Sequence, residues 1–175
     1  MPSRQAIREP LPEGPRILDS SRFRANRRRE VSGPGLRTFL RIADEWGLSE
    51  QERLRVLGLP GRSTFHSWVA KARRGADLTL SVDELIRISA VLGIYKGLKI
   101  IFPREGDAAR WLRSPNAGRV FGGQTPVALI VSGTQDALML VRRYLDAWRG
   151  GTFAAPVPGF DGVVAPMSDD DLVFV

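Results

Sequence analysis

The sequence predicts an all-α fold, and three observations support this prediction. Apolar residues recur at spacings of three and four in several segments, as they do along one face of an α-helix. Ser or Thr precedes several of these segments, with Glu three residues later or Pro at the first helical position. Gly or Pro stands where the segments end. We therefore expect an N-terminal helix-turn-helix bundle followed by a smaller helical domain, with disordered or extended arms at both ends.

The 175 residues suffice for one domain or two small ones with a real core. The chain has no Cys, which excludes disulfides, thiolate catalysis and Cys-based zinc sites. No apolar run approaches the roughly 18 residues of a membrane span, and the N-terminus lacks the apolar core of a signal peptide. We expect a cytoplasmic protein that does not enter a membrane.

The net charge of +7 is unevenly distributed. Residues 1–31 and 32–75 each carry eight cationic and four acidic side chains, whereas residues 151–175 carry four Asp and no Lys or Arg. A basic front favours nucleic acid as its partner, and an acidic end indicates a different one. Solvated arms without a ligand are the alternative explanation.

Residues 1–31 mix Pro, Arg and Glu without apolar periodicity, so we expect a basic, disordered arm there. Such an arm is suited to contacting DNA phosphates, and a flexible leader is the alternative. Residues 32–104 then form the predicted helix-turn-helix domain. Its first helix spans residues 35–46, with an apolar stripe that ends at Trp46, and Gly47 stops it.

Ser49 is predicted to cap the second helix, with Glu52 at the capping-box position. Residues 58–61, Gly-Leu-Pro-Gly, form a tight break before a third helix that begins at Ser63. Small polar residues come early in that helix and cations come late, which is typical of a DNA-reading helix, although an ordinary bundle helix with a solvated basic face is the alternative. The predicted DNA-binding residues are Ser63, Thr64, Ser67, Lys71, Arg73 and Arg74.

Ser81, with Glu84 three residues later, predicts a capping box for a fourth helix that runs to Gly93. Residues 94–102 are expected to continue as a short apolar helix until Pro103 stops it. We interpret this segment as core, with dimerisation as the alternative because apolar helices at domain junctions are also common contact surfaces.

Residues 105–155 are assigned to a second helical domain, organised around the turn between Trp111 and Pro126. Proline cannot continue a helix at Pro115, and two adjacent glycines at positions 122 and 123 permit backbone angles that other residues avoid. Thr125 is a suitable N-cap for a short helix, and a longer helix follows over residues 134–149. Residues 156–175 are predicted to form an acidic, extended tail.

Four groups of residues in the second half occur in a characteristic order. The most specific is the series Trp-Leu-x-x-Pro-Asn followed by Phe-x-Gly-x-x-Pro, at residues 111–126. With Leu92-Gly93-Ile94-Tyr95 before it and Arg143-Tyr144-Leu145 and Gly151-Thr152-Phe153-Ala154 after it, this series resembles the Xre/MbcA/ParS-like antitoxins. The resemblance covers residues 36–156 and includes Gly58-Leu59-Pro60 with Ser63 and Trp68.

The resemblance implies an antitoxin of a type II toxin–antitoxin system that neutralises a cognate RES-domain toxin, and the NAD chemistry would belong to that toxin. It also implies homodimerisation and repression of its own operon through operator DNA. The acidic tail lies outside the resemblance, and its charge alone suits it to a toxin cleft that binds the NAD pyrophosphate. The expected toxin-binding residues are Trp111, Pro115, Asn116, Phe121, Gly122, Gly123, Arg143, Tyr144, Asp169, Asp170, Asp171 and Val175.

Two other classes of function are alternatives. A stand-alone helix-turn-helix transcriptional regulator without a toxin partner is the main alternative. An enzyme would need a nucleophile, a base or a metal-binding constellation, and the chain offers a single His, no Cys, and one run of Asp residues at 169–171 without further ligands. We therefore expect no catalytic residues, no metal and no cofactor.

Overall fold

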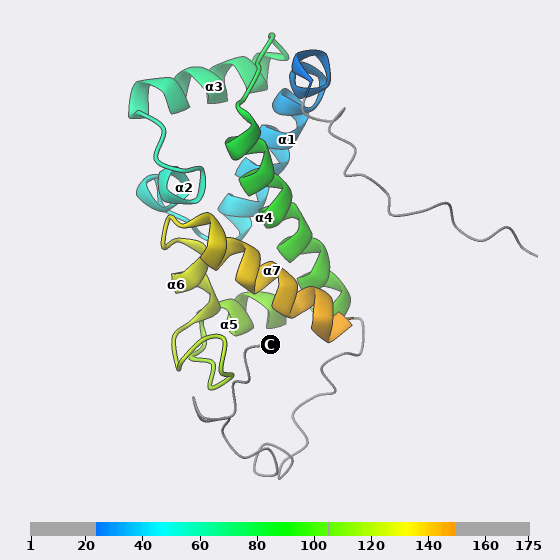
Figure 1. Cartoon of the computed structure of the whole chain (residues 1–175), viewed down its shortest axis with the longest axis vertical. Helices are drawn as coiled ribbons and strands as arrows, with labels where there is room; N and C mark the ends of the chain where they lie inside the picture. The colour runs from blue at the N-terminus through cyan, green and yellow to red at the C-terminus, as the bar shows by residue number, and fades with distance from the viewer. Residues whose placement is uncertain (1–23, 105, 150–175) are drawn as a thin grey trace, which may run out of the picture.

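The computed structural model describes residues 24–104 and 106–149, and it places seven helices and no strand in these ranges (Figure 1). The all-α prediction is therefore confirmed. The basic arm up to residue 23 and the tail from residue 150 lie outside the described residues. The helices are α1 (Ala25–Glu45), α2 (Glu50–Val56), α3 (Arg62–Arg74), α4 (Val82–Ile101), α5 (Asp107–Arg113), α6 (Pro126–Ile130) and α7 (Gln135–Arg149).

Helix α1 begins ten residues earlier than predicted and runs through Pro34, so residues 25–31 belong to a helix and not to a disordered arm. The reason is a tertiary contact made by Ser32, which is fully buried. Its hydroxyl donates to the carbonyl of Arg28 at 2.6 Å and accepts a hydrogen bond from the amide of Leu80 at 2.9 Å. Pro34 costs one helical hydrogen bond but faces solvent. The contacts of Ser32 hold the turns that precede the proline.

The predicted helix caps on α2 and α4 are confirmed. Ser49 and Glu52 form a reciprocal capping box, and Ser81 and Glu84 form a second one. Each box satisfies two backbone donors that a helix start would otherwise leave unpaired. Helix α3 begins at Arg62, one residue before the predicted start, and its N-cap Gly61 provides no side-chain acceptor.

Helix α4 is continuous from Val82 to Ile101, so the predicted end at Gly93 is wrong. Gly93 and Gly97 instead allow α7 to approach α4 closely. A Cβ atom at Gly93 would lie 2.7 Å from Nε of Arg142, and one at Gly97 would lie 3.3 Å from Cβ of Leu145. A glycine in a helix interior costs conformational free energy, and here close packing offsets that cost.

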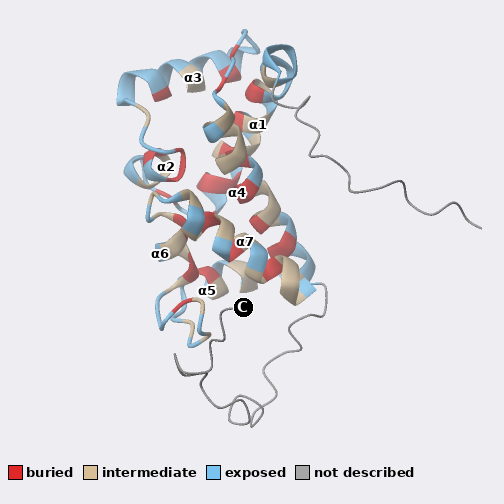
Figure 2. Cartoon of the chain, in the orientation of Figure 1, coloured by how far each residue is buried: buried red, intermediate tan, exposed pale blue. Residues whose placement is uncertain are grey.

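The buried residues of the described part form one core along α4, which packs against α1 on one side and α7 on the other (Figure 2). Helix α3 closes the end beside the start of α1, and α5 and α6 close the opposite end beside α7 (Figure 1). Because α4 contributes to both halves, no linker separates the helix-turn-helix from the helices that follow. The largest fully buried side chains are Phe39, Leu36, Ile42, Leu57, Leu80, Ile94, Leu98, Leu112, Ile130, Leu138 and Leu145.

Candidate functional site

The turn between α2 and α3 has the geometry of a helix-turn-helix corner. After α2 the amide of Gly58 donates to the carbonyl of Arg55 at 3.0 Å, and the amide of Leu59 donates to the carbonyl of Leu54 at 2.7 Å. This pair of bonds is a Schellman motif, which needs a left-handed residue at Gly58 (φ 88°). Leu59 also has a positive φ, 63°, and is 69% exposed. The tight break over residues 58–61 was predicted, but a positive φ at Leu59 was not.

Helix α3 separates a buried face from an exposed face, as the reading-helix prediction requires. Phe65 and Ala72 are buried, Trp68 and Val69 are half-buried, and the six predicted DNA-binding residues are all exposed. None of those six makes a side-chain hydrogen bond or ion pair within the described residues. At about 100° per residue, Ser63, Ser67, Lys71 and Arg74 form one outward stripe. Thr64 borders the stripe, and Arg73 lies on the opposite flank.

A small charged cluster joins the start of α3 to the start of α2. Nε2 of His66 lies 3.0 Å from one carboxylate oxygen of Glu50, and Nε of Arg62 lies 3.2 Å from the other. The hydrogen bond with His66 is the largest cause that lowers the pKa of Glu50, and the cationic neighbours add to it. His66 is therefore a hydrogen-bonded surface residue at the edge of the exposed face of α3.

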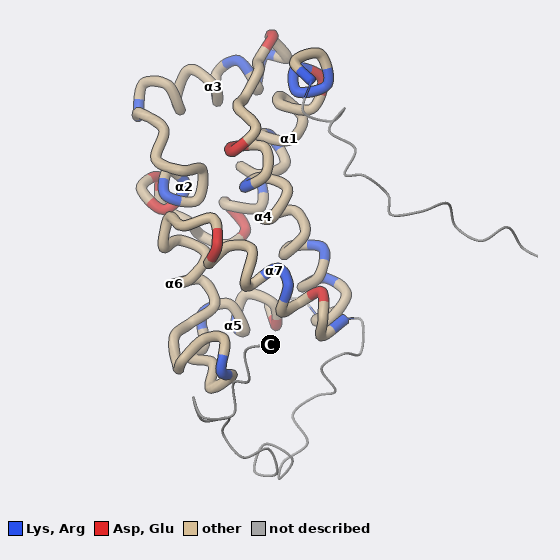
Figure 3. Tube along the Cα trace, in the orientation of Figure 1, with Lys and Arg blue, Asp and Glu red and all other residues tan. Residues whose placement is uncertain are grey.

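Cations gather at the end of the molecule formed by α3 and the start of α1 (Figure 3). Arg24, Arg27 and Arg29 are exposed in the first turns around α1, near the cationic C-terminal turn of α3. Arg29 pairs with Asp77 in the loop after α3, and Arg37 donates to the carbonyl of Ala72 at 2.8 Å. The exposed face of α3 thus continues into a cationic edge.

The corner predicted between Trp111 and Pro126 is held by backbone bonds centred on Asn116. The amide of Asn116 donates to the carbonyl of Gln124 at 3.1 Å, and its carbonyl accepts the amide of Gly123 at 3.0 Å. The side chain of Asn116 accepts the amide of Gly118 at 2.9 Å. Gly122 and Gly123 have φ values of 55° and 82°, so the predicted need for glycine is confirmed.

An aromatic cluster lies beneath this corner. The ring of Trp111 lies 5.8 Å from Phe121 and 6.3 Å from Tyr144, and the rings of Phe121 and Tyr144 meet edge to face at 4.9 Å. Phe102 and Trp148 complete the cluster around Trp111. Burial raises the pKa of Tyr144. Phe102 and Trp148 were not among the predicted site residues, although both follow the apolar periodicity of their helices.

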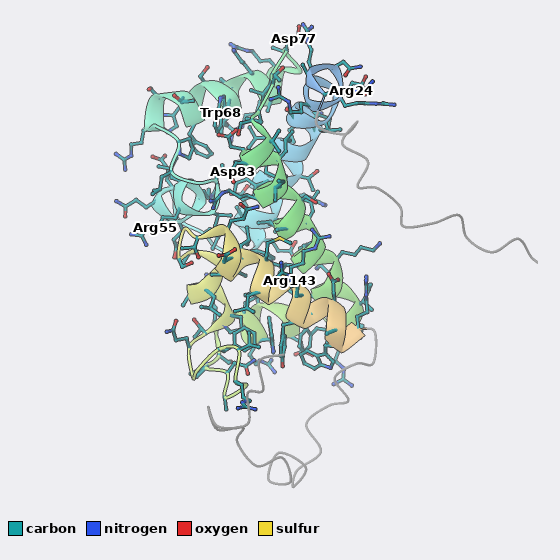
Figure 4. The ribbon with its side chains drawn as sticks, in the orientation of Figure 1. Arg24, Arg55, Trp68, Asp77, Asp83 and Arg143 are labelled. Carbon is teal, nitrogen blue, oxygen red and sulfur yellow. The ribbon has the colours of Figure 1, made fainter. Side chains whose placement is uncertain are left out.

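The predicted toxin-binding residues that fall within the described ranges differ in accessibility. Pro115, Gly122, Gly123 and Arg143 are exposed, and Arg143 lies on the outer side of α7 (Figure 4). Trp111, Asn116 and Tyr144 are half-buried, and Phe121 is only 2% exposed, so it supports the corner from beneath. The remaining predicted residues, Asp169, Asp170, Asp171 and Val175, lie outside the described residues.

In the part of the chain that the structure describes, no group of three or more His, Cys, Asp or Glu side chains is arranged to hold a metal ion. None of the helices in the same ranges is both long and apolar enough to cross a membrane.

A helix-turn-helix with an exposed cationic face, continued through a shared helix into a second helical domain, defines a two-part class of protein. Comparison with known families agrees with both parts. Residues 26–93 match the antitoxin Xre-like helix-turn-helix domain, and residues 98–151 match the antitoxin Xre/MbcA/ParS C-terminal toxin-binding domain.

The chain is also similar to the uncharacterized protein y4oB of Sinorhizobium fredii (strain NBRC 101917 / NGR234). The two are 41% identical over 116 residues, which cover 66% of this chain and 84% of that protein. The chain belongs to the Xre/MbcA/ParS antitoxin family, and its toxin-binding domain implies a cognate toxin as partner.

Proposed function

We propose that this antitoxin binds and neutralises a RES-domain toxin that consumes NAD, and that it represses its own operon by binding operator DNA. The observation that carries the proposal is the pairing of the two antitoxin domains in one chain. In this proposal α3 contacts DNA and the second domain contacts the toxin. Neither activity requires a catalytic residue in this chain.

The toxin contact is proposed to centre on the corner after α5. Its backbone is fixed by the bonds of Asn116, and its base is fixed by Phe121 and Trp111, so little conformational entropy would be lost on binding. Gly122 and Gly123 expose backbone to the partner, and Arg143 supplies an exposed cation nearby. Tyr144, next to Arg143 in α7, packs against Phe121 of the corner and so links α7 to the corner.

Inhibition is proposed to involve the acidic tail. A toxin that binds NAD must offer cationic or hydrogen-bond donor groups to a pyrophosphate. Asp169, Asp170 and Asp171, with the apolar residues up to Val175, are electrostatically suited to occupy such a cleft. The alternative is that the second helical domain inhibits the toxin alone.

The DNA contact is proposed to use the outward stripe of α3, with Lys71 and Arg74 at phosphates and the small polar residues of the first turns at base edges. Arg73 is assigned to a phosphate on the flank. A homodimer would place two such helices on the two halves of a palindromic operator, about one helical turn of DNA apart.

Co-expression with the product of the adjacent gene tests the toxin assignment. We expect a stable complex on co-purification, and we expect the NAD-consuming activity of the partner to disappear in that complex. A chain that binds its own upstream DNA but captures no partner and blocks no NAD consumption would be a stand-alone regulator, which is the alternative function.

Deleting residues 160–175 tests the tail separately. If the tail inhibits, the shortened protein still co-purifies with the toxin but no longer blocks NAD consumption at equal concentration. A control that replaces Asp169, Asp170 and Asp171 with Asn keeps the length and removes the charge. Full inhibition by both variants would assign inhibition to the helical domain.

A further inference from the structure

The side chain of Arg87 lies at a junction of three elements. It extends from α4, is 11% exposed, and its Nε donates to Asp83 at 2.8 Å. Its Nη1 donates to the carbonyl of Gly133, in the turn between α6 and α7, at 3.0 Å, and lies 3.5 Å from the carbonyl of Val56 at the end of α2. One guanidinium therefore contacts both the helix-turn-helix and the toxin-binding domain.

The two turns that meet at Arg87 also fit closely. A Cβ atom at Gly58 would lie 3.0 Å from Nε of Arg87, and one at Gly133 would lie 3.8 Å from both Cβ and the carbonyl oxygen of Arg55. Gly58 is the first residue of the corner that leads into α3, and Gly133 lies in the turn just before α7. Figure 4 labels Asp83 and Arg55, which belong to the α4 and α2 sides of this junction.

We propose that Arg87 is a positioning residue for DNA reading: it fixes the corner before α3 against the turn before α7, and so sets the orientation of the reading helix. The proposal rests on the proposed operator binding. Arg87 does not lie on the α3 stripe and is largely buried, so it acts through the backbone of residues 56–58 and not by touching DNA.

The three partners of Arg87 explain why this position needs a guanidinium. Its planar fork offers several donors in fixed directions, and here they serve one carboxylate and two backbone carbonyls. A lysine could serve only some of these acceptors. A methionine of similar length would fill the space and leave the carbonyl of Gly133 without this donor.

Base reading and phosphate binding respond differently to a small displacement of α3. Phosphate contacts are electrostatic and tolerate movement, whereas hydrogen bonds to base edges require fixed geometry. Loss of the Arg87 contacts should therefore lower the preference for the operator while leaving non-specific affinity and its salt dependence in place. A general loss of stability would lower both affinities together.

The experiment compares full-length wild type with Arg87→Met, Arg87→Lys and the matched control Arg142→Met. Arg142 also joins the two domains, by a 3.4 Å bond to the carbonyl of Ser89, but it does not touch the corner before α3. The probes are a duplex of about 200 base pairs from directly upstream of the gene and a scrambled duplex of equal length. Amide hydrogen exchange is measured on the same four proteins.

We expect Arg87→Met to reduce the preference for the upstream duplex at least about fivefold, the lower limit for one bidentate base contact. Arg87→Lys should show a smaller loss, and Arg142→Met should keep the wild-type preference. The amides of residues 57–61, apart from Pro60, and of residues 131–134 should exchange fastest in Arg87→Met, and at the wild-type rate in Arg142→Met. An unchanged preference, or an equal loss on both duplexes, overturns the proposal.

Failure of the proposed operator binding has a different signature. If wild type itself shows no preference for the upstream duplex, the operator assignment is wrong, and DNA reading by way of Arg87 is wrong with it. If wild type prefers that duplex and Arg87→Met does so equally, operator binding stands and only the role of Arg87 is refuted. Faster exchange at residues 57–61 and 131–134 would then show that Arg87 holds the two turns together without affecting the preference for the upstream duplex.

Discussion

Replacing Lys71 and Arg74 with Ala tests the proposed DNA contact of α3 most directly. Both side chains are exposed and have no partner within the described residues, so the change removes no internal contact. The two cations do lie in the last turn of the helix, where they favour its macrodipole by about 0.3–1 kcal/mol each. Ala is the best helix former, which offsets part of that loss. We therefore expect a variant that stays folded, with its free energy of unfolding lowered by no more than about 1–2 kcal/mol.

The magnitude follows from counterion release. Each lost phosphate contact reduces the slope of log K against log salt concentration by about 0.9, so two contacts reduce it by about 1.8. Between about 50 and 200 mM salt, the advantage of wild type over the double variant should then shrink roughly tenfold. The loss of affinity itself should be largest at the lower salt concentration.

Gel-shift titrations at the two salt concentrations provide the measurement. The matched control is Lys96→Ala with Arg104→Ala, which removes the same charge from two exposed residues outside α3 that lack side-chain partners in the described ranges. The control should keep most of the wild-type slope. Equal slopes for wild type and the Lys71 and Arg74 variant would refute the assignment of this stripe to phosphates.

Three further predictions concern the second domain. Gly122→Val or Gly123→Val should weaken toxin binding, because valine at these positive φ angles strains the backbone by about 1–3 kcal/mol. No atom lies within 4 Å of either added Cβ, so the effect would come from strain and not from a clash. Native affinity together with a native circular dichroism spectrum would count against a role for the corner. Phe121→Ala should lower the free energy of unfolding by about 3–5 kcal/mol in a denaturant titration, since its ring is buried against Trp111 and Tyr144, and a loss below about 1 kcal/mol would mean that the cluster is not a core. Burial raises the pKa of Tyr144 above that of a tyrosine in the unfolded chain, which is about 10. Neutral Tyr144 should therefore stabilise the fold fully below that pH, and this stabilisation should be lost as the pH rises through the pKa of the folded state. An ultraviolet titration in which Tyr144→Phe shows the same absorbance change as wild type above about pH 10 would contradict this assignment.

The parts of the fold that local chemistry determines could be predicted from the sequence. Ser49 with Glu52 and Ser81 with Glu84 formed their capping boxes because the partners are three residues apart. Thr125 caps α6, with Pro126 as its first residue. The exposed stripe of α3 was likewise predictable, because it needs only the helical period.

The features that depend on distant residues could not be predicted in this way. The start of α1 depends on the bond between Ser32 and Leu80, which are 48 positions apart. In the sequence Gly93 indicates a helix stop, but in the structure it makes room for the side chain of Arg142. Arg87 gave no signal as a site residue, since two of its three partners are backbone carbonyls on other elements.

The boundary between the two family domains, at residues 93–98, falls inside α4 and not in a loop. Recombination between antitoxins of this type at the domain boundary would therefore join two parts of one continuous helix. One residue inserted there would turn the second half by about 100° and advance it by about 1.5 Å. Gly93, which belongs to the first half, would then no longer face Arg142 of the second half. An exchange of toxin-binding domains between relatives should therefore keep the number of residues across this segment unchanged, because only then do both halves of α4 stay in phase.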